Sequence, residues 1–155
     1  MLKKLFFAAL AALAMVGCNE KNVEVSEMKP GEKIQLTVKL PYGVTKVTGA
    51  PADAQVNDLQ IFVFDKNGVY ETSSHGTGAT LTLTCTSGEK QIVALANAPL
   101  ETGIGNIAEL GAAVSDLADC AAGNIVMSGM VVKELTASST VTMEVERLAA
   151  KVGVS

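Results

Sequence analysis

The sequence predicts a mainly β protein, an antiparallel β-sandwich of about seven strands with one short helix. Short segments in which apolar and polar residues alternate recur from residue 32 onward, and such alternation is typical of half-buried strands. Turn-forming Gly, Asn, Asp and Pro residues separate these segments. One segment, beginning at Asn106, instead has apolar residues every three or four positions, as an amphipathic helix does. This pattern favours two packed sheets, with the helix added at an edge or end.

The N-terminus predicts an export leader. Two lysines precede the apolar residues 5–14, a run shorter than the roughly 20 residues that cross a bilayer. A small residue then precedes Cys18, which completes the pattern of a secretory signal peptide. Met-Val-Gly-Cys at residues 15–18 resembles the bacterial lipobox, so we expect residues 1–17 to be a lipoprotein signal peptide and Cys18 to carry the lipid. The alternative is an ordinary signal peptide cut elsewhere, with Cys18 incidental.

The composition after the leader argues against several functions. Removing 17 of 155 residues leaves 138, enough for one domain with its own core. Without Lys3 and Lys4, the chain has 10 basic and 16 acidic side chains, a net charge of −6, which argues against nucleic acid as a partner. The chain has no Trp, one His and one Arg. So few catalytic side chains make an enzyme a poor interpretation, and we expect no cofactor.

Two cysteines follow Cys18, namely Cys85 and Cys120. Exported compartments permit a disulfide between them. The alternative is that both are small buried apolar residues.

The mature chain begins with a predicted tether and a first strand. Residues 18–31 are polar and have no sustained period, so they predict a flexible tether. Residues 32–40 predict a half-buried strand, and residues 41–56, rich in Gly and Pro, are expected to be mostly loop. The apolar positions of the strand are Ile34, Leu36, Val38 and Leu40.

The next segment predicts a central strand and a hairpin. Residues 59–64 have apolar side chains on both faces, as expected of a strand that is covered on each side. Residues 65–68, Asp-Lys-Asn-Gly, predict a turn in which Asn67 and Gly68 take positive φ, followed by a return strand. Residues 72–78, rich in Ser, Thr and Gly, are expected to form a loop tip.

Two further strands are predicted over residues 81–86 and 90–96, with a turn between them, and the helix follows. Asn106 and Glu109 resemble a capping box at the start of this helix, and Gly123 ends it. Its apolar stripe consists of Ile107, Leu110, Val114, Leu117 and Ala121.

The C-terminal part predicts extended segments over residues 125–130, 131–135 and 140–152. In the last of these, Val141, Met143 and Val145 are expected on one face, opposite Thr142, Glu144 and Glu146. The alternation weakens from Leu148, where we expect a bulge or bend.

No segment has the side chains of a catalytic or metal site. His75 lies in a predicted loop, and no Cys or His stands at ligand spacing from it. Residues 65–68 loosely resemble a calcium loop, but the later ligands are missing, so a turn is the better interpretation. A strand-rich domain of this kind is expected to act through its surface or its sheet edges, which can pair with a further strand.

Four segments in this order resemble one known family. They are Asp-Leu-Gln-Ile-Phe-Val-Phe-Asp at residues 58–65, Ile-Val-Ala-Leu-Ala-Asn-Ala-Pro at 92–99, Met-Ser-Gly at 127–129 and Val-Glu-Arg-Leu-Ala-Ala-Lys-Val at 145–152. Together with the lipobox, the series resembles the N-terminal domain of the fimbrillin, or major fimbrial subunit, family, which builds the type V pili of Gram-negative anaerobes. The likeness covers residues 32–152.

The resemblance implies a transthyretin-like β-sandwich that assembles by strand exchange. In the family, a lipid-anchored precursor is cut in the loop after its first strand, and a strand from the next subunit fills the groove left behind. Here the resemblance implies displacement of residues 32–40 and a cut within residues 41–56. Lys46 is the only basic residue of that loop, so the sequence does not support cleavage by an arginine-specific protease.

Family members also carry a second, C-terminal sandwich that donates the strand. This sequence ends at Ser155, just after the expected first domain. We expect a fragment or a truncated gene product. The alternative is a one-domain lipoprotein that receives a strand without donating one.

The leading functional hypothesis is a structural or accessory subunit of surface fimbriae, exported as a lipoprotein to the cell outer membrane and supporting adhesion. Its expected partners are other fimbrial subunits, the outer membrane through the lipid, and a host or bacterial surface ligand. The alternative is a single-domain outer-membrane lipoprotein that acts as a surface binding module. A hydrolase would require a polar cluster around His75 or a pair of carboxylates.

Overall fold

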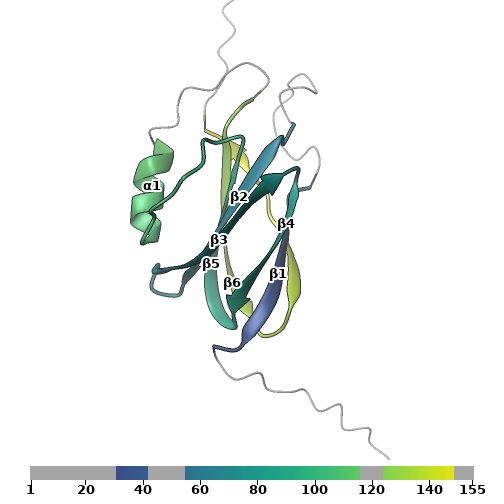
Figure 1. Cartoon of the computed structure of the whole chain (residues 1–155), viewed down its shortest axis with the longest axis vertical. Helices are drawn as coiled ribbons and strands as arrows, with labels where there is room; N and C mark the ends of the chain where they lie inside the picture. Colours follow the sequence, from purple (N-terminus) through teal and green to yellow (C-terminus); the bar gives the residue numbers. More distant parts are fainter. Residues whose placement is uncertain (1–30, 42–54, 116–123, 149–155) are drawn as a thin grey trace, which may run out of the picture.

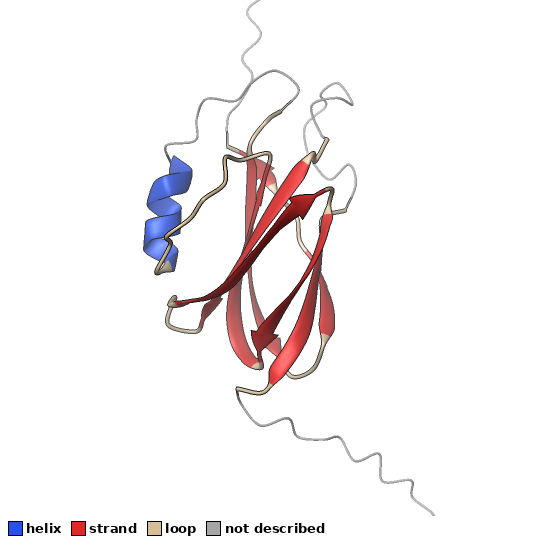
Figure 2. Cartoon of the chain, viewed as in Figure 1, coloured by secondary structure: helices blue, strands red, loops and turns tan. Residues whose placement is uncertain are grey.

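The computed structural model describes residues 31–41, 55–115 and 124–148. A three-stranded sheet has the order β4-β1-β7, and a five-stranded sheet has the order β3-β2-β5-β6-β8. The two sheets face each other, and α1 lies on the far side of the five-stranded sheet (Figures 1 and 2). The predicted mainly β sandwich with one short helix is therefore confirmed. The elements are β1 (Lys33–Lys39), β2 (Asp58–Asp65), β3 (Tyr70–Thr77), β4 (Thr80–Thr86), β5 (Gly88–Ala96), α1 (Ile107–Ser115), β6 (Met127–Leu135), β7 (Ser139–Thr142) and β8 (Glu146–Arg147).

The main core lies between the two sheets. Successive side chains of a strand point to opposite faces, so every second residue of a half-buried strand enters this core. The core residues contributed by β1, β4, β2 and β5 include Ile34, Leu36, Val38, Leu83, Cys85, Leu59, Ile61, Val63, Ile92 and Ala94.

Among the described residues, no helix is long and apolar enough to cross a membrane.

The strand β2 is buried on both faces, which confirms the prediction for residues 59–64. It lies between β3 and β5, with Phe62 opposite Ser73 on one side and opposite Val93 on the other. Phe62 and Phe64 point away from the main core and form a second cluster with Leu110 of α1. The rings of Phe62 and Phe64 stack with centroids 6.5 Å apart.

This second cluster corrects the expected place of the helix. The helix α1 covers the outer face of the five-stranded sheet instead of packing at an edge or end. The physical reason is that β2 and β5 present apolar side chains on their outer face as well, and these must be shielded from water. Leu117, Ala121 and the expected helix end at Gly123 lie outside the described residues.

The start of α1 is capped as predicted. The Asn106 Oδ1 atom accepts a hydrogen bond of 3.0 Å from the Glu109 N–H, which satisfies one of the free N–H groups at the helix start. The Glu109 carboxylate accepts hydrogen bonds of 2.8 Å from the Asn106 side-chain amide and from the Gly105 N–H. In a capping box the Glu109 carboxylate would accept from the Asn106 backbone N–H. Here it accepts from these two neighbouring groups instead.

The predicted turn after β2 is confirmed, with one correction. The Gly68 N–H donates to the Asp65 carbonyl at 3.0 Å, and Gly68 has a φ of 79°. Asn67 does not take positive φ, because among the described residues only Asn97 does so without being a glycine. Asp65 Oδ1 instead accepts hydrogen bonds from the Asn67 and Val69 N–H groups. The Val69 bond in particular holds the pKa of Asp65 below its usual value.

The return strand predicted after the turn is present as β3, but the loop tip predicted for residues 72–78 is wrong, because residues 72–77 belong to this strand. The ladder with β2 runs from Phe64 opposite Tyr70 to Asp58 opposite Thr77. Since β3 is an edge strand whose side chains are exposed or half-buried, it does not need the apolar alternation by which strands are recognised in a sequence. His75 therefore lies on a strand, opposite Gln60, and not in a loop.

The C-terminal extended segments are also divided differently. Residues 125–130 and 131–135 do not form two strands, since β6 runs through both from Met127 to Leu135. The run predicted over residues 140–152 is interrupted at 143–145, which was not expected, and the bend expected at Leu148 is present as well. Here the chain leaves β7 in one sheet and reaches β8 in the other, which alternation alone does not reveal. Val141, Met143 and Val145 are all buried, as predicted.

Candidate functional site

The strand β1 is the middle strand of the three-stranded sheet, and this position makes it the candidate site. It pairs with β4 in antiparallel fashion from Lys33 opposite Thr86 to Lys39 opposite Thr80. On its other side it pairs with β7 in parallel fashion, from Leu36 opposite Ser139 onward. This parallel pair is the one exception to the antiparallel arrangement among the described strands.

The inward side chains of β1 fill the core between the sheets. They are at most 4% exposed, whereas Lys33, Gln35 and Lys39 on the outer face are exposed. The strand predicted over residues 32–40 is therefore confirmed. Burying four aliphatic side chains stabilises the sandwich by roughly 6–12 kcal/mol, at about 1.5–3 kcal/mol each. The inward side chains are Ile34, Leu36, Val38 and Leu40.

Both ends of β7 are hydrogen-bonded to β1. Near the start of β1, the Gln35 N–H donates to Ser138 Oγ at 3.0 Å. At its end, the Met143 N–H donates to the Lys39 carbonyl at 2.9 Å. Among the described strands, β7 pairs with no strand other than β1.

The contacts between β1 and β4 extend beyond the strand ends. The Ser87 N–H donates to the Glu32 carbonyl at 2.7 Å, and Ser87 Oγ accepts from the Glu32 N–H at 3.1 Å. At the opposite end, the Leu40 N–H donates to the Ala79 carbonyl at 2.8 Å. On the outer face, the hydroxyl groups of Thr37 and Thr82 lie 2.9 Å apart.

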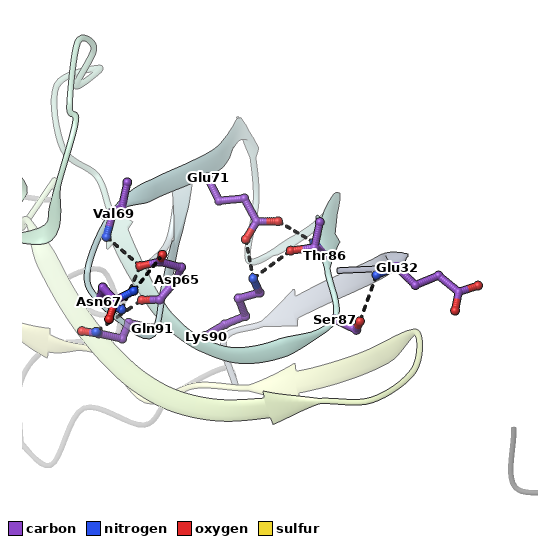
Figure 3. A network of polar contacts seen from close by, with 9 residues as sticks. All are labelled: Glu32, Asp65, Asn67, Val69, Glu71, Thr86, Ser87, Lys90 and Gln91. Carbon is purple, nitrogen blue, oxygen red and sulfur yellow. Dashed lines mark hydrogen bonds and ion pairs between the residues drawn. The ribbon is translucent and has the colours of Figure 1, made fainter. Parts of the chain in front are cut away.

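A partly buried ion pair lies at the end of β4, and we call Glu71, Thr86 and Lys90 the Glu71 cluster (Figure 3). The Glu71 carboxylate is 2.6 Å from Lys90 Nζ and accepts a 2.5 Å hydrogen bond from the Thr86 N–H. Lys90 Nζ also donates to Thr86 Oγ1 at 2.8 Å. Glu71 belongs to β3 and Lys90 to β5, so the cluster joins the five-stranded sheet to β4.

The electrostatics of the cluster follow from its partial burial. The Lys90 side chain is 6% exposed and that of Glu71 is 20% exposed. Burial by itself raises the pKa of Glu71, but the hydrogen bonds from Lys90 and Thr86 outweigh it, so its pKa lies below the ordinary value of 4.5. The carboxylate is thus charged at neutral pH, which leaves the buried Lys90 paired.

Cys85 is buried in the main core on β4, and burial raises the pKa of its thiol. It forms no disulfide within the described part of the chain. Cys120 lies outside the described residues, so a disulfide between the two stays a prediction.

Two other predicted site residues, Cys18 and Lys46, lie outside the described residues, as does most of the loop over residues 41–56. Within residues 31–41, 55–115 and 124–148, no three His, Cys, Asp or Glu side chains gather in a way that could hold a metal ion. His75 lies on the edge strand β3, opposite Gln60 of β2, and therefore in the other sheet from β1.

The sequence did not single out the polar side chains that hold the loops of the sandwich. Asn97, with a φ of 58°, accepts from the Asn57 N–H at 2.8 Å and donates to the Gln55 and Ile125 carbonyls. Gln60, 1% exposed, donates to the carbonyls of Ala98 and Pro99. The only signal for either was a polar residue within or directly after an apolar run.

A shallow apolar groove lies between α1 and β6 on the outer face. It has a volume of about 220 Å³, and Met130, one of its lining residues, is 59% exposed. Leu95, Ile107, Leu110 and Val114 also line it.

Comparison with known proteins places these features in a family. A family model described as "Major fimbrial subunit protein (FimA)" matches residues 34–153. No curated protein matches the sequence. The structure is similar to a fimbrilin (fimA) from Porphyromonas gingivalis W83, with a TM-score of 0.55 and 18% identity, covering 74% of this chain and 40% of that chain.

Two other solved structures are similar in the same way. The tip fimbrial protein Mfa3 from Porphyromonas gingivalis, truncated at its C-terminus, has a TM-score of 0.56 and 15% identity, with 75% of this chain and 48% of that chain covered. A fimbrial assembly protein from Parabacteroides distasonis ATCC 8503 has a TM-score of 0.52 and 16% identity, with 75% and 52% covered. The chain thus spans about half or less of the length of these proteins. The structures share its fold, and the family match extends over most of the sequence: this chain belongs to the major fimbrial subunit protein (FimA) family.

Proposed function

We propose that this chain is a structural or accessory subunit of surface fimbriae, exported as a lipoprotein and assembled by strand exchange, and that it supports adhesion. The family to which it belongs is one of structural fimbrial subunits and not of enzymes. Its partners are other fimbrial subunits, and its place is the cell surface.

One observation carries the proposal: β1 is the middle strand of a sheet in which both neighbours pair with it alone among the described strands. Removing a middle strand opens a groove between β4 and β7 and exposes the core beneath it. The groove has unpaired N–H and C=O groups on both sides and an apolar floor. Because both are costly in water, such a groove strongly favours a new strand.

The groove also defines the strand that fits it. The occupant must be extended, with apolar residues at every second position to replace Ile34, Leu36, Val38 and Leu40. Its other side chains face water, so they are polar, as Gln35 and Thr37 are. In a fimbria, this strand comes from another subunit. A cut within residues 41–56, for which Lys46 is the candidate position, frees β1.

Lipid attachment at Cys18 supplies the membrane anchor in this proposal. Each buried methylene group contributes about 0.8 kcal/mol, so several acyl chains on one cysteine hold a protein at the outer membrane. The intact mass of the chain from native outer membranes tests this step. An acylated chain that begins at Cys18 is expected, and an unacylated chain would remove the anchor from the proposal.

A disulfide lock tests strand exchange directly. Thr37 and Thr82 lie opposite each other on β1 and β4, so the double variant Thr37→Cys/Thr82→Cys is expected to tie β1 to its own sandwich when oxidised. A matched control is Glu89→Cys/Glu134→Cys, which links β5 to β6 in the five-stranded sheet. The amount of each variant in isolated fimbriae, and its ladder on unheated gels, is measured with and without reductant.

The expected result is that the oxidised Thr37–Thr82 lock is missing from fimbriae and returns on reduction, while the control pair enters as the wild type does. Equal entry of both oxidised pairs would show that β1 is not displaced. Absence of the wild-type chain from fimbriae would contradict the subunit role itself.

The second candidate function is a surface binding module, anchored as a monomer. The observation that favours it is the apolar groove between α1 and β6, with Met130 and Val132 more than half exposed beside it. A wild-type chain that stays lipidated, resists cutting and remains monomeric would give this candidate the lead.

A further inference from the structure

The two neighbours of β1 are held in unequal ways, and this difference sets an order for strand exchange. We propose that β4 stays in place when β1 leaves, because the Glu71 cluster holds it, and that an incoming strand therefore pairs with β4 first and with β7 last. This inference rests on the proposed strand exchange and adds to it an order and two positioning residues, Glu71 and Lys90.

The strand β4 has anchors at both ends that do not involve β1. At its C-terminal end, Glu71 accepts the Thr86 N–H and Lys90 Nζ donates to Thr86 Oγ1. Just before its N-terminal end, the Gly78 N–H donates to the Asn57 carbonyl at 3.0 Å. The partners Asn57, Glu71 and Lys90 all lie in the five-stranded sheet or beside it.

These anchors survive the loss of β1 because the five-stranded sheet does not depend on that strand. Glu71 is supplied by β3, which pairs with β2, and Lys90 by β5, which pairs with β2 and β6. Figure 3 shows Glu71 and Lys90 reaching Thr86 from these two strands, while the contact between Ser87 and Glu32 lies next to them. The end of β4 where β1 begins is thus fixed by side chains of the other sheet.

Among the described residues, the strand β7 has no such side-chain anchor to the five-stranded sheet. Its ladder bonds, and the bonds of the adjoining Ser138 and Met143, go to β1. Within the described residues, what remains for the β7 segment without β1 is apolar packing. Val141 is 6% exposed, and Met143 and Val145, which follow the strand, are 3% and 7% exposed. Since β7 is four residues long, it cannot keep a strand conformation through its own contacts.

The difference determines where pairing begins. A strand that binds to a pre-positioned edge loses only its own conformational freedom, whereas binding to β7 first would require ordering both segments at once. The edge of β4 also offers seven antiparallel positions, against four parallel positions on β7. The incoming strand is therefore expected to form its β4 ladder in the rate-limiting step and its β7 ladder afterwards.

The kinetics of strand binding test this order. The full chain, with a recognition sequence for a specific protease placed after Lys46, is cut so that β1 remains bound without a covalent link. A fluorescent synthetic peptide of residues 31–41 is then exchanged for β1. Its release rate is measured by a chase with excess unlabelled peptide and its Kd by dilution, and the association rate is the release rate divided by Kd. Glu71→Ala, which removes the acceptor of the Thr86 N–H, and Lys90→Met loosen β4. Ser138→Ala is the matched variant on the β7 side, since it removes the acceptor of the Gln35 N–H.

Contacts present in the transition state affect association, and later contacts affect release. We expect the Glu71 and Lys90 variants to slow association about tenfold with little change in release. Ser138→Ala is expected to speed release while association stays within about twofold. If the cluster only stabilised the fold, these variants would weaken the domain without affecting association and release separately.

If the Glu71 and Lys90 variants changed mainly release and Ser138→Ala changed mainly association, the proposed order would be overturned while strand exchange stayed intact. A cut chain that never takes up the peptide would instead contradict the proposed function, so the two failures are distinguishable.

Hydrogen exchange of the uncut wild-type chain is a second measurement that needs no variant. The Thr86 amide is expected to exchange only with global unfolding, and the Met143 amide together with the opening of β1. Exchange of Thr86 in that same opening would also overturn the order.

Discussion

The two sheets of this domain depend on their individual strands in different ways. In the five-stranded sheet, β2 and β5 each pair on both sides, and α1 covers the outer face. In the three-stranded sheet, both outer strands pair with β1 alone among the described strands, and the outer face is open to water. The five-stranded sheet is therefore the stable body of the domain, and the three-stranded sheet is stable only while one strand is in place.

The difference shows how a single fold can be both rigid and able to open. Stability is not uniform across a protein, and segments open with free energies between zero and that of global unfolding. Here, β1 is costly to remove because four of its side chains are buried. Its removal nevertheless leaves β2 and β5 paired on both sides within the five-stranded sheet. A domain that exchanges strands needs both properties, so the contrast between the sheets can be measured by perturbing each in turn.

The largest effect is expected in the five-stranded sheet. Phe64 is fully buried beneath α1, and its ring centroid lies 6.3 Å from that of Tyr70. Phe64→Ala is expected to lower the free energy of unfolding by about 3–5 kcal/mol, as large cavities at aromatic sites do. Urea unfolding followed by circular dichroism measures the loss. Thr84→Ala, on the exposed face of β4, is the control and is expected to change stability by less than about 0.5 kcal/mol. A loss below about 1 kcal/mol for Phe64→Ala would contradict the assigned role of the five-stranded sheet.

The second prediction concerns β1 itself. Leu36 is 0% exposed at the centre of the strand, and Leu36→Ala is expected to cost about 2–5 kcal/mol. Hydrogen exchange resolves where this loss falls. Amides of β1 and β4 are expected to exchange faster, while those of β2 and β5 keep most of their protection.

Leu59→Ala is the matched control, since Leu59 is also fully buried and lies in the same core, but on β2. It is expected to speed exchange in both sheets. Should Leu36→Ala also speed exchange equally in both, the two sheets would open as one unit, and the contrast drawn above would be lost.

The sequence predicted most of the sheets because their apolar alternation is a local property. The strands around Leu36, Ile61, Leu83 and Ala94 were recognised in this way, and so was the helix at Asn106. The start of the edge strand β3 was predicted as the return strand after the turn, but its continuation through residues 72–77 was missed. Ser and Thr residues are held there by the β2 ladder and not by burial. The interruption at 143–145 was missed because alternation identifies the face of a strand, but not the sheet to which the strand belongs.

The candidate site was predicted only in part, for the same reason. The alternation in residues 32–40 identified the strand that fills the groove. It could not reveal that β4 and β7 both depend on that strand, since pairing is set by tertiary structure. Glu71 and Lys90 resemble ordinary surface charges in the sequence. They become a partly buried pair only when β3, β4 and β5 meet at one end of the sandwich.

The third prediction tests the connections at the opposite end of the sandwich. Asn97 joins residues 55–57, which precede β2, to Ile125, which precedes β6. Asn97→Gly removes these hydrogen bonds and is expected to cost roughly 1–3 kcal/mol. Asn97→Ala should cost about 1–2 kcal/mol more, because its Cβ makes the positive φ unfavourable. Urea unfolding of both variants measures the difference. Equal losses would mean that the backbone at this position relaxes when the side chain is removed.

The smallest effect is expected from the charge of Glu71, since Gln at this position still accepts a hydrogen bond. The pKa of Glu71 lies below its ordinary value of 4.5 in the folded protein. The folded state therefore binds this proton less readily than the unfolded state does. The stability that the carboxylate contributes is complete above about pH 4.5 and is lost as the pH falls through the lowered pKa.

Urea midpoints of the wild type and Glu71→Gln, measured from about pH 6 down to about pH 3, test this sign. The wild type is expected to be the more stable at the upper end, and the difference should shrink below about pH 4.5. Lys90→Met is the control, because it removes the cation that pairs with the carboxylate. In that background, Glu71→Gln should change the pH dependence less. Parallel curves for the wild type and Glu71→Gln would mean that the pair contributes no charge-dependent stability. The hold on β4 would then rest on the neutral hydrogen bonds at Thr86 and on Gly78, and the five-stranded sheet would keep its neighbour in place at any pH at which the domain is folded.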